Sequence, residues 1–174
     1  MHLSRRLADE MVVCCFVVLV VTGAFLAFFY RAGGTPVVYG GPFAPLLGIE
    51  MSQAYASTMR ISFEVRGGLL IRHLHAWSAL LLGAGVLLRA ALTWRWALLL
   101  VLVGTGLLTG WRLTDGDDAG WWYGGHLVVA VGVLGLLLPG VRPGLRLIAG
   151  LGIGLVVLAL YFPLNQIWLY GPAR

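Results

Sequence analysis

The chain has 174 residues, of which 60% are hydrophobic and only 11% are charged. A soluble domain of this size is not so apolar, so the composition indicates an integral membrane protein. The formal net charge of +5 has its simplest cause in arginine-rich cytoplasmic loops, so we expect a lipid bilayer and no nucleic acid as partner. We predict an all-α fold, an integral membrane helix bundle.

The first predicted membrane helix covers residues 11–30 and follows a short N-terminus, residues 1–10, that carries Arg5 and Arg6. About twenty apolar residues exceed the core of a secretory signal peptide, so this segment is a membrane helix whose N-terminus lies in the cytoplasm. Gly23 leaves a notch on this helix. Either another helix packs into that notch, or a flat cofactor approaches closely there.

A long loop, residues 31–67, follows the first span. Residues 32–48 are rich in Gly and Pro and predict an irregular loop on the outer face. Residues 49–65 fit a short amphipathic helix that lies along the membrane surface. No membrane span is expected in this part of the chain.

Four further spans are predicted, which gives five transmembrane helices in a single domain, residues 11–166, and a short tail, residues 167–174. The connections after the second, third and fourth spans are short, so consecutive helices are expected to run antiparallel. The four spans are residues 68–92, 97–111, 121–138 and 145–162.

The positions of the arginines set the expected orientation in the membrane. The N-terminus, the turn at Arg95 and the turn at Arg142 carry basic residues, so they are expected to face the cytoplasm. The long first loop, the loop after the third span and the C-terminal tail then lie outside. We expect a multi-pass protein of a bacterial inner membrane.

An acidic cluster, Asp115, Asp117 and Asp118, lies in the loop after the third span. Its charges are those of a solvated loop, or of a docking patch for a positively charged partner. The sequence leaves both readings open.

Arg72, His75 and His126 lie inside segments that are otherwise apolar enough for a bilayer. Ionisable side chains at that depth are costly and are the first candidates for function. On a helix, Arg72 and His75 share one face and His73 points away from both. With a rise of 1.5 Å per residue, both His75 and His126 lie within about 6 to 11 Å of the outer surface.

A single intramembrane histidine could simply bond a neighbouring helix. Two histidines at equal depth on two helices instead suit a haem in the bundle core, with one axial ligand from each side. Arg72, one turn from His75, could pair with a haem propionate. Gly23 and Gly106 could make room for the porphyrin on the flanking helices.

Three segments carry a resemblance to a known family. Residues 68–79, GLLIRHLHAWSA, are similar to a motif of the form G-W-L-I-R-Y-L-H-A-N-G-A. Residues 22–27, TGAFLA, are similar to T-G-L-F-L-A, and residues 106–111, GLLTGW, are similar more weakly to G-Y-V-L-P-W. Over about residues 10–138, the chain resembles the N-terminal haem-binding half of the cytochrome b family of bc1 and b6f complexes.

The resemblance implies a four-helix core that holds one haem b near the outer face. Two histidines would be its axial ligands, an arginine would meet a propionate, and two glycines would lie against the ring. His73 falls where the family has an aromatic residue, so it is not expected to be a ligand. The implied site residues are His75, His126, Arg72, Gly23 and Gly106.

The chain also departs from the family. The family places a second histidine fourteen residues beyond each of the first pair, and here those positions hold Arg89 and Gly140. Neither residue ligates iron, so no inner haem and no haem-to-haem path across the membrane are expected. The loop after the third span is short and the family's P-E-W-Y sequence has no counterpart, which argues against bifurcated quinol oxidation.

We therefore expect a one-haem membrane cytochrome b subunit. It would relay single electrons between quinone or quinol, or a membrane partner, and a redox protein on the outer, periplasmic face. Other subunits of a membrane redox complex would be its partners, and catalysis by the chain alone is not expected. The alternative is a structural membrane anchor subunit without its own haem. A small transporter is disfavoured, because the two halves show no inverted repeat.

Overall fold

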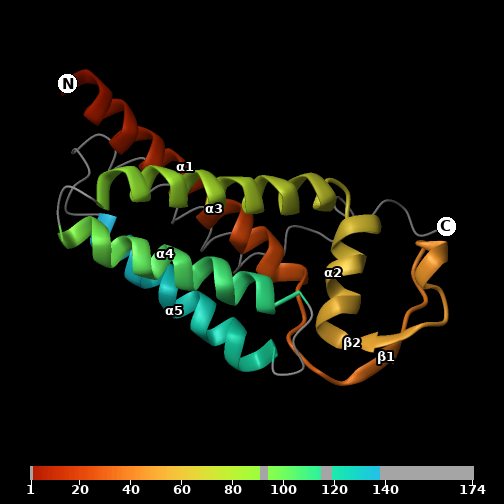
Figure 1. Cartoon of the computed structure of the whole chain (residues 1–174). Coiled ribbons are helices and arrows are strands. Elements are labelled where there is room, and N and C mark those ends of the chain that lie inside the picture. The colour runs from red at the N-terminus through yellow and green to blue at the C-terminus, as the bar shows by residue number, and fades with distance from the viewer. Residues whose placement is uncertain (1, 91–93, 115–118, 138–174) are drawn as a thin grey trace.

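The computed structural model describes residues 2–90, 94–114 and 119–137. Within these ranges the chain forms five α-helices, two short strands and one 3-10 turn (Figure 1). The elements are α1 (His2–Phe29), β1 (Pro36–Val38), η1 (Ala44–Leu46), β2 (Glu50–Ser52), α2 (Gln53–Phe63), α3 (Gly68–Ala90), α4 (Trp94–Arg112) and α5 (Ala119–Leu137). The predicted span 145–162, the tail 167–174, the acidic cluster at 115–118 and Gly140 lie outside the described residues.

Four long helices, α1, α3, α4 and α5, form the body of the molecule. Three of them contain apolar segments long enough to cross a bilayer, and α4 contains a shorter one. In Figure 1, α2 stands across the bundle at the end away from the N-terminus, and we call this end the α2 end. The predicted all-α membrane helix bundle is confirmed for the described residues. The apolar segments are Met11–Phe29, Gly68–Ala90, Gly120–Leu137 and, in α4, Trp96–Arg112.

One face of α3 is apolar and exposed. Leu70, Trp77, Leu81 and Leu88 recur there at steps of seven, four and seven residues, which places them on one stripe of the helix. A stripe of this kind suits contact with lipid chains, because lipid and leucine are equally apolar. The opposite face of α3 is therefore the one that packs inside the bundle.

The helices pack in the order α1, α3, α4, α5. At the end away from α2, apolar side chains from all four helices form one buried cluster, which we call the apolar core. Close packing holds it, because burial from lipid supplies little hydrophobic driving force. Gly85 allows α3 to approach α1, since a Cβ there would lie 2.8 Å from Val12 Cγ2. The core residues are Val12, Phe16, Leu82, Val86, Leu99, Val103, Val133 and Leu137.

The segment between α1 and α3 contains a short antiparallel pairing of β1 and β2, with Pro36 opposite Ser52 and Val38 opposite Glu50. The sequence predicts an irregular loop over β1 and the start of a surface helix over β2. It misses both strands, because three-residue strands are too short to show an alternating pattern. Ser52 then caps α2, as its Oγ accepts a hydrogen bond from the Tyr55 amide at 3.1 Å.

A tight corner joins α2 to α3. Gly67 has a φ of +76°, which a residue with a Cβ rarely adopts. At Gly68, an added Cβ would overlap the Ile61 carbonyl, so only glycine permits α2 to pack this closely on the start of α3. The corner fixes the position of the first turns of α3, which carry Arg72 and His75.

Tyr30, at the end of α1, contacts residues of α5 and of the end of α4. Its hydroxyl donates a 2.7 Å hydrogen bond to the Leu113 carbonyl, just beyond α4. Its ring lies 5.6 Å from that of Tyr123 on α5, centroid to centroid. The ends of α1 and α4 and the start of α5 are thereby held together at the α2 end.

Candidate functional site

His75 on α3 and His126 on α5 face each other across the bundle. Their ring centroids are 6.3 Å apart and their ring planes are inclined by 55°. Both side chains are half-buried. The two histidines that the sequence singles out are therefore brought together, from helices that are separated by α4 in the packing order.

Each histidine lies within hydrogen-bonding distance of a threonine on the neighbouring helix. Thr22 Oγ1 of α1 lies 2.9 Å from His75 Nδ1. Thr109 Oγ1 of α4 lies 3.0 Å from His126 Nδ1. Both threonines are buried, so each imidazole has one ring nitrogen engaged with a neighbouring helix and the other available.

A glycine follows each of these threonines and lies against the same imidazole. A Cβ at Gly23 would lie 3.1 Å from His75 Cε1, and a Cβ at Gly110 would lie 3.2 Å from His126 Cε1. The helices α1 and α4 thus present the same Thr-Gly pair to a histidine. The dipeptide occurs three times in the sequence, at Thr22, Thr105 and Thr109, so the sequence alone does not single out the two copies that meet a histidine.

The other predicted residues lie as follows. Arg72 Nη1 donates a hydrogen bond to Ser62 Oγ on α2, and His73 is exposed. A Cβ at Gly106 would lie 3.4 Å from Val129 Cγ1, so Gly106 borders α5 at a valine. The glycine beside His126 is Gly110, one helical turn further along α4.

The site has two ligand-type side chains. Among the described residues, no three His, Cys, Asp or Glu side chains lie close enough to hold a metal ion together. Two imidazoles alone suit a metal in a macrocycle, which supplies the remaining ligands. Two nitrogens at about 2 Å from a shared metal centre place their ring centroids on the order of 6 Å apart. The observed 6.3 Å matches that separation.

Comparisons with known proteins point to one family. The chain is 46% identical over 85 residues to the cytochrome bc1 complex cytochrome b subunit of Mycobacterium leprae, which is 49% of this chain and 15% of the relative. It is 40% identical over 121 residues to the subunit of the same name in Streptomyces coelicolor, which is 61% of this chain and 22% of the relative. Over these residues the chain is similar to cytochrome b subunits.

No family model matches the chain. A third relative, the cytochrome bc1 complex cytochrome b subunit of Corynebacterium efficiens, is 45% identical over 75 residues. The chain thus spans about 15% to 22% of the length of the first two cytochrome b relatives. These relatives are bacterial proteins, and the apolar helices described above agree with a place in a bacterial membrane.

An ion pair lies where the cytochrome b resemblance would place a second ligand on α3. Arg89 Nη2 lies 2.8 Å from Asp9 Oδ1 of α1, and its side chain is only 16% exposed. The Arg89 guanidinium also stacks over Trp96, at 5.0 Å from the ring centroid. The apolar core, with side chains from all four long helices, lies at the same end of the bundle.

Breaking this ion pair is expected to destabilise the bundle. We expect Arg89→Gln to cost about 1 kcal/mol, because the pair is only partly shielded from water. Asp9→Asn should have a similar effect, and the double variant should lose little more than either single one. The check is the unfolding midpoint in detergent, with Arg66→Gln as the control, because Arg66 is exposed. Fully additive losses would show that the two residues do not interact.

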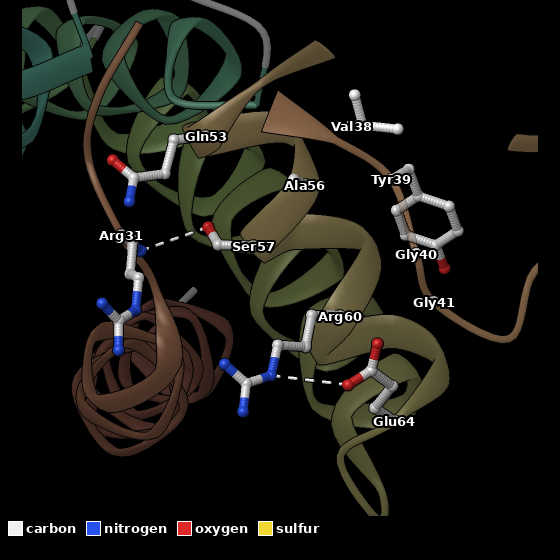
Figure 2. Close-up of a pocket in the computed structure, with 10 residues that line it drawn as sticks. All are labelled: Arg31, Val38, Tyr39, Gly40, Gly41, Gln53, Ala56, Ser57, Arg60 and Glu64. Carbon is white, nitrogen blue, oxygen red and sulfur yellow. Dashed lines mark hydrogen bonds and ion pairs between the residues drawn. The ribbon is translucent and has the colours of Figure 1, made fainter. Parts of the chain in front are cut away.

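A separate hollow of about 270 Å³ opens between the residues that follow α1 and the helix α2 (Figure 2). Arg31 lies on one side of it, where its amide donates to Ser57 Oγ at 3.1 Å. Arg60 and Glu64 form an ion pair of 3.4 Å on the other side. Among the described residues that line this hollow there is no histidine, so it is distinct from the His75 and His126 site.

Proposed function

We propose that the chain is a one-haem cytochrome b subunit of a membrane redox complex, with His75 and His126 as the axial ligands. The observation that carries the proposal is the 6.3 Å separation of the two imidazoles across the bundle. A bound haem b would accept and release one electron at a time. The chain's own residues would orient the macrocycle, shield it from water and set its potential.

Further residues have roles in this proposal. Gly23 and Gly110 leave the two imidazoles room, since a Cβ at either position would press on a ring. Gly106, one turn from Gly110, would border the ring more remotely. Arg72 is the residue for a haem propionate, because its half-buried guanidinium lies one turn from His75 and is held by a single serine hydroxyl.

The single haem is the second part of the proposal. Its support is the arrangement at the other end of the bundle, where Asp9 and Arg89 form an ion pair and the apolar core brings together side chains of all four long helices. A second macrocycle would have to displace that core, and Arg89 cannot ligate iron.

We also infer the surroundings of the site. The N-terminal arginines would lie in the cytoplasm, so the α2 end, and with it the histidine pair, would lie near the outer face. The curated relatives are named as subunits of a bc1 complex. Electrons would therefore pass between quinone or quinol, or another membrane subunit, and a redox protein on the periplasmic side.

A reduced-minus-oxidised visible spectrum of the purified chain tests the proposal, with haem and protein quantified on the same sample. We expect one low-spin b-type haem per chain. A chain without haem would instead support the structural anchor. Two haems per chain would contradict the single site and would require a ligand pair other than His75 and His126.

A further inference from the structure

Thr22 and Thr109 make the same set of contacts, each on its own helix. Thr22 Oγ1 lies 2.6 Å from the Val18 carbonyl oxygen and 2.9 Å from His75 Nδ1. Thr109 Oγ1 lies 2.9 Å from the Thr105 carbonyl oxygen and 3.0 Å from His126 Nδ1. A second backbone oxygen lies farther from each hydroxyl, that of Leu19 at 3.3 Å from Thr22 Oγ1 and that of Gly106 at 3.1 Å from Thr109 Oγ1. Among the described residues, each hydroxyl therefore has only backbone carbonyl oxygens and one imidazole nitrogen as its hydrogen-bonding partners.

Counting protons assigns the direction of these hydrogen bonds. A carbonyl oxygen has no proton, so a contact of 2.6 Å between it and a hydroxyl oxygen requires the hydroxyl proton to lie between them. A threonine has one such proton, and it is used in this bond back to the preceding turn. The second contact also needs a proton, and only the imidazole can supply it.

We propose that Thr22 and Thr109 hold His75 and His126 in the tautomer that is protonated at Nδ1, which leaves Nε2 of both rings as an electron-pair donor. This inference rests on the proposed function for its purpose, because Nε2 would then be the ligand atom on both sides of one haem. The threonines are positioning residues, since they act through the histidines.

The hydrogen bond has two physical consequences. It fixes the rotation of each imidazole, and the adjacent glycine leaves room for the ring on the same side. It also makes Nε2 a stronger donor, because a proton partly withdrawn from Nδ1 leaves more charge on the ring. A stronger donor favours the oxidised metal and so lowers the reduction potential.

The tautomer can be measured directly in haem-free protein. The experiment uses the full chain in detergent with nitrogen-15-labelled histidine, in a background carrying His2→Gln and His73→Gln, so that only two rings remain visible. Nitrogen chemical shifts distinguish a protonated from a bare ring nitrogen. We expect Nδ1 to be protonated in both rings. A ring protonated at Nε2 would overturn the inference for that histidine, whether or not haem binds.

Variants test the same contact in the haem-loaded chain. Thr22→Val and Thr109→Val keep the shape and remove the hydroxyl, and each is expected to weaken haem binding roughly 10-fold and to shift the reduction potential upward. Thr22→Ser and Thr109→Ser should restore both properties. Thr105→Val is the matched control, because Thr105 donates to the Val101 carbonyl on the same helix as Thr109.

The outcomes separate the two proposals. If the valine variants bind haem as tightly as Thr105→Val, at an unchanged potential, the positioning role is refuted while the haem site stands. If no variant and no wild-type chain binds haem, the proposed function fails, and the nitrogen shifts of the haem-free protein still decide the tautomer.

Discussion

Replacing either His75 or His126 by alanine is expected to abolish haem binding. Each imidazole would supply one of the only two axial ligands, and among the described residues no other histidine lies within the bundle core. The check is the haem-to-protein ratio of the purified variants, read from the visible spectrum. His73→Ala is the matched control, because His73 lies on the same helix within two residues of His75 and is exposed.

The control separates ligand loss from general damage to α3. The His73→Ala spectrum should match that of the unaltered chain, and all three variants should unfold at similar temperatures without haem. An equal loss of haem from all three variants would show that the assigned helix faces are wrong. Retention of a low-spin spectrum in His75→Ala would exclude that residue as a ligand.

A leucine at Gly110 is expected to remove most of the haem without unfolding the bundle. The Cβ alone would lie 3.2 Å from His126 Cε1, so the larger side chain must displace the imidazole from its present position. Loss of ligand alignment of this kind reduces metal affinity by roughly 10-fold or more. Gly23→Leu should act in the same way on His75. The measurement is haem affinity, by titration of haem into the haem-free chain.

Gly104→Leu provides the control on the same helix. A Cβ at Gly104 meets no atom within 4 Å, so leucine there should leave haem binding unchanged and favour the helix. If the variants at positions 104 and 110 bind haem equally well, the glycine at 110 is not required by the histidine. If both variants lose haem, a leucine disturbs α4 at either position, and the loss is not specific to the contact with His126.

The helices of this molecule could be predicted because membrane depth imposes a simple rule. Long apolar runs must be helical there, and α1, α3, α4 and α5 coincide with such runs. The β1 and β2 pairing could not be predicted, because it depends on backbone contacts between segments about a dozen residues apart and on strands of three residues each.

For the candidate site, the sequence indicates which residues are functional more reliably than it indicates which residues contact them. An ionisable side chain in an apolar run stands out, which is why Arg72, His75 and His126 are predicted. The contacts of Gly110, Thr22 and Thr109 with the two histidines depend on how the helices are aligned along one another. The alignment of α1 with α3 decides the contact of Thr22, and that of α4 with α5 decides the contacts of Thr109 and Gly110. One helical turn, about 5.4 Å, separates a glycine that meets Val129 from one that meets His126. The composition of a helix does not predict its position along a neighbouring helix to within one turn.

In the proposal, the ion pair of Asp9 with Arg89 and the adjacent apolar core occupy the end of the bundle where a second haem would lie. This has a consequence for the membrane potential. A charge that crosses a membrane works against the transmembrane voltage, at about 2.3 kcal/mol per 100 mV. With a single redox centre at the α2 end, an electron would enter and leave on the same side of the bilayer. Turnover through this bundle would then be electrically silent: it could connect two reactions, and any contribution to the membrane potential would have to come from another subunit.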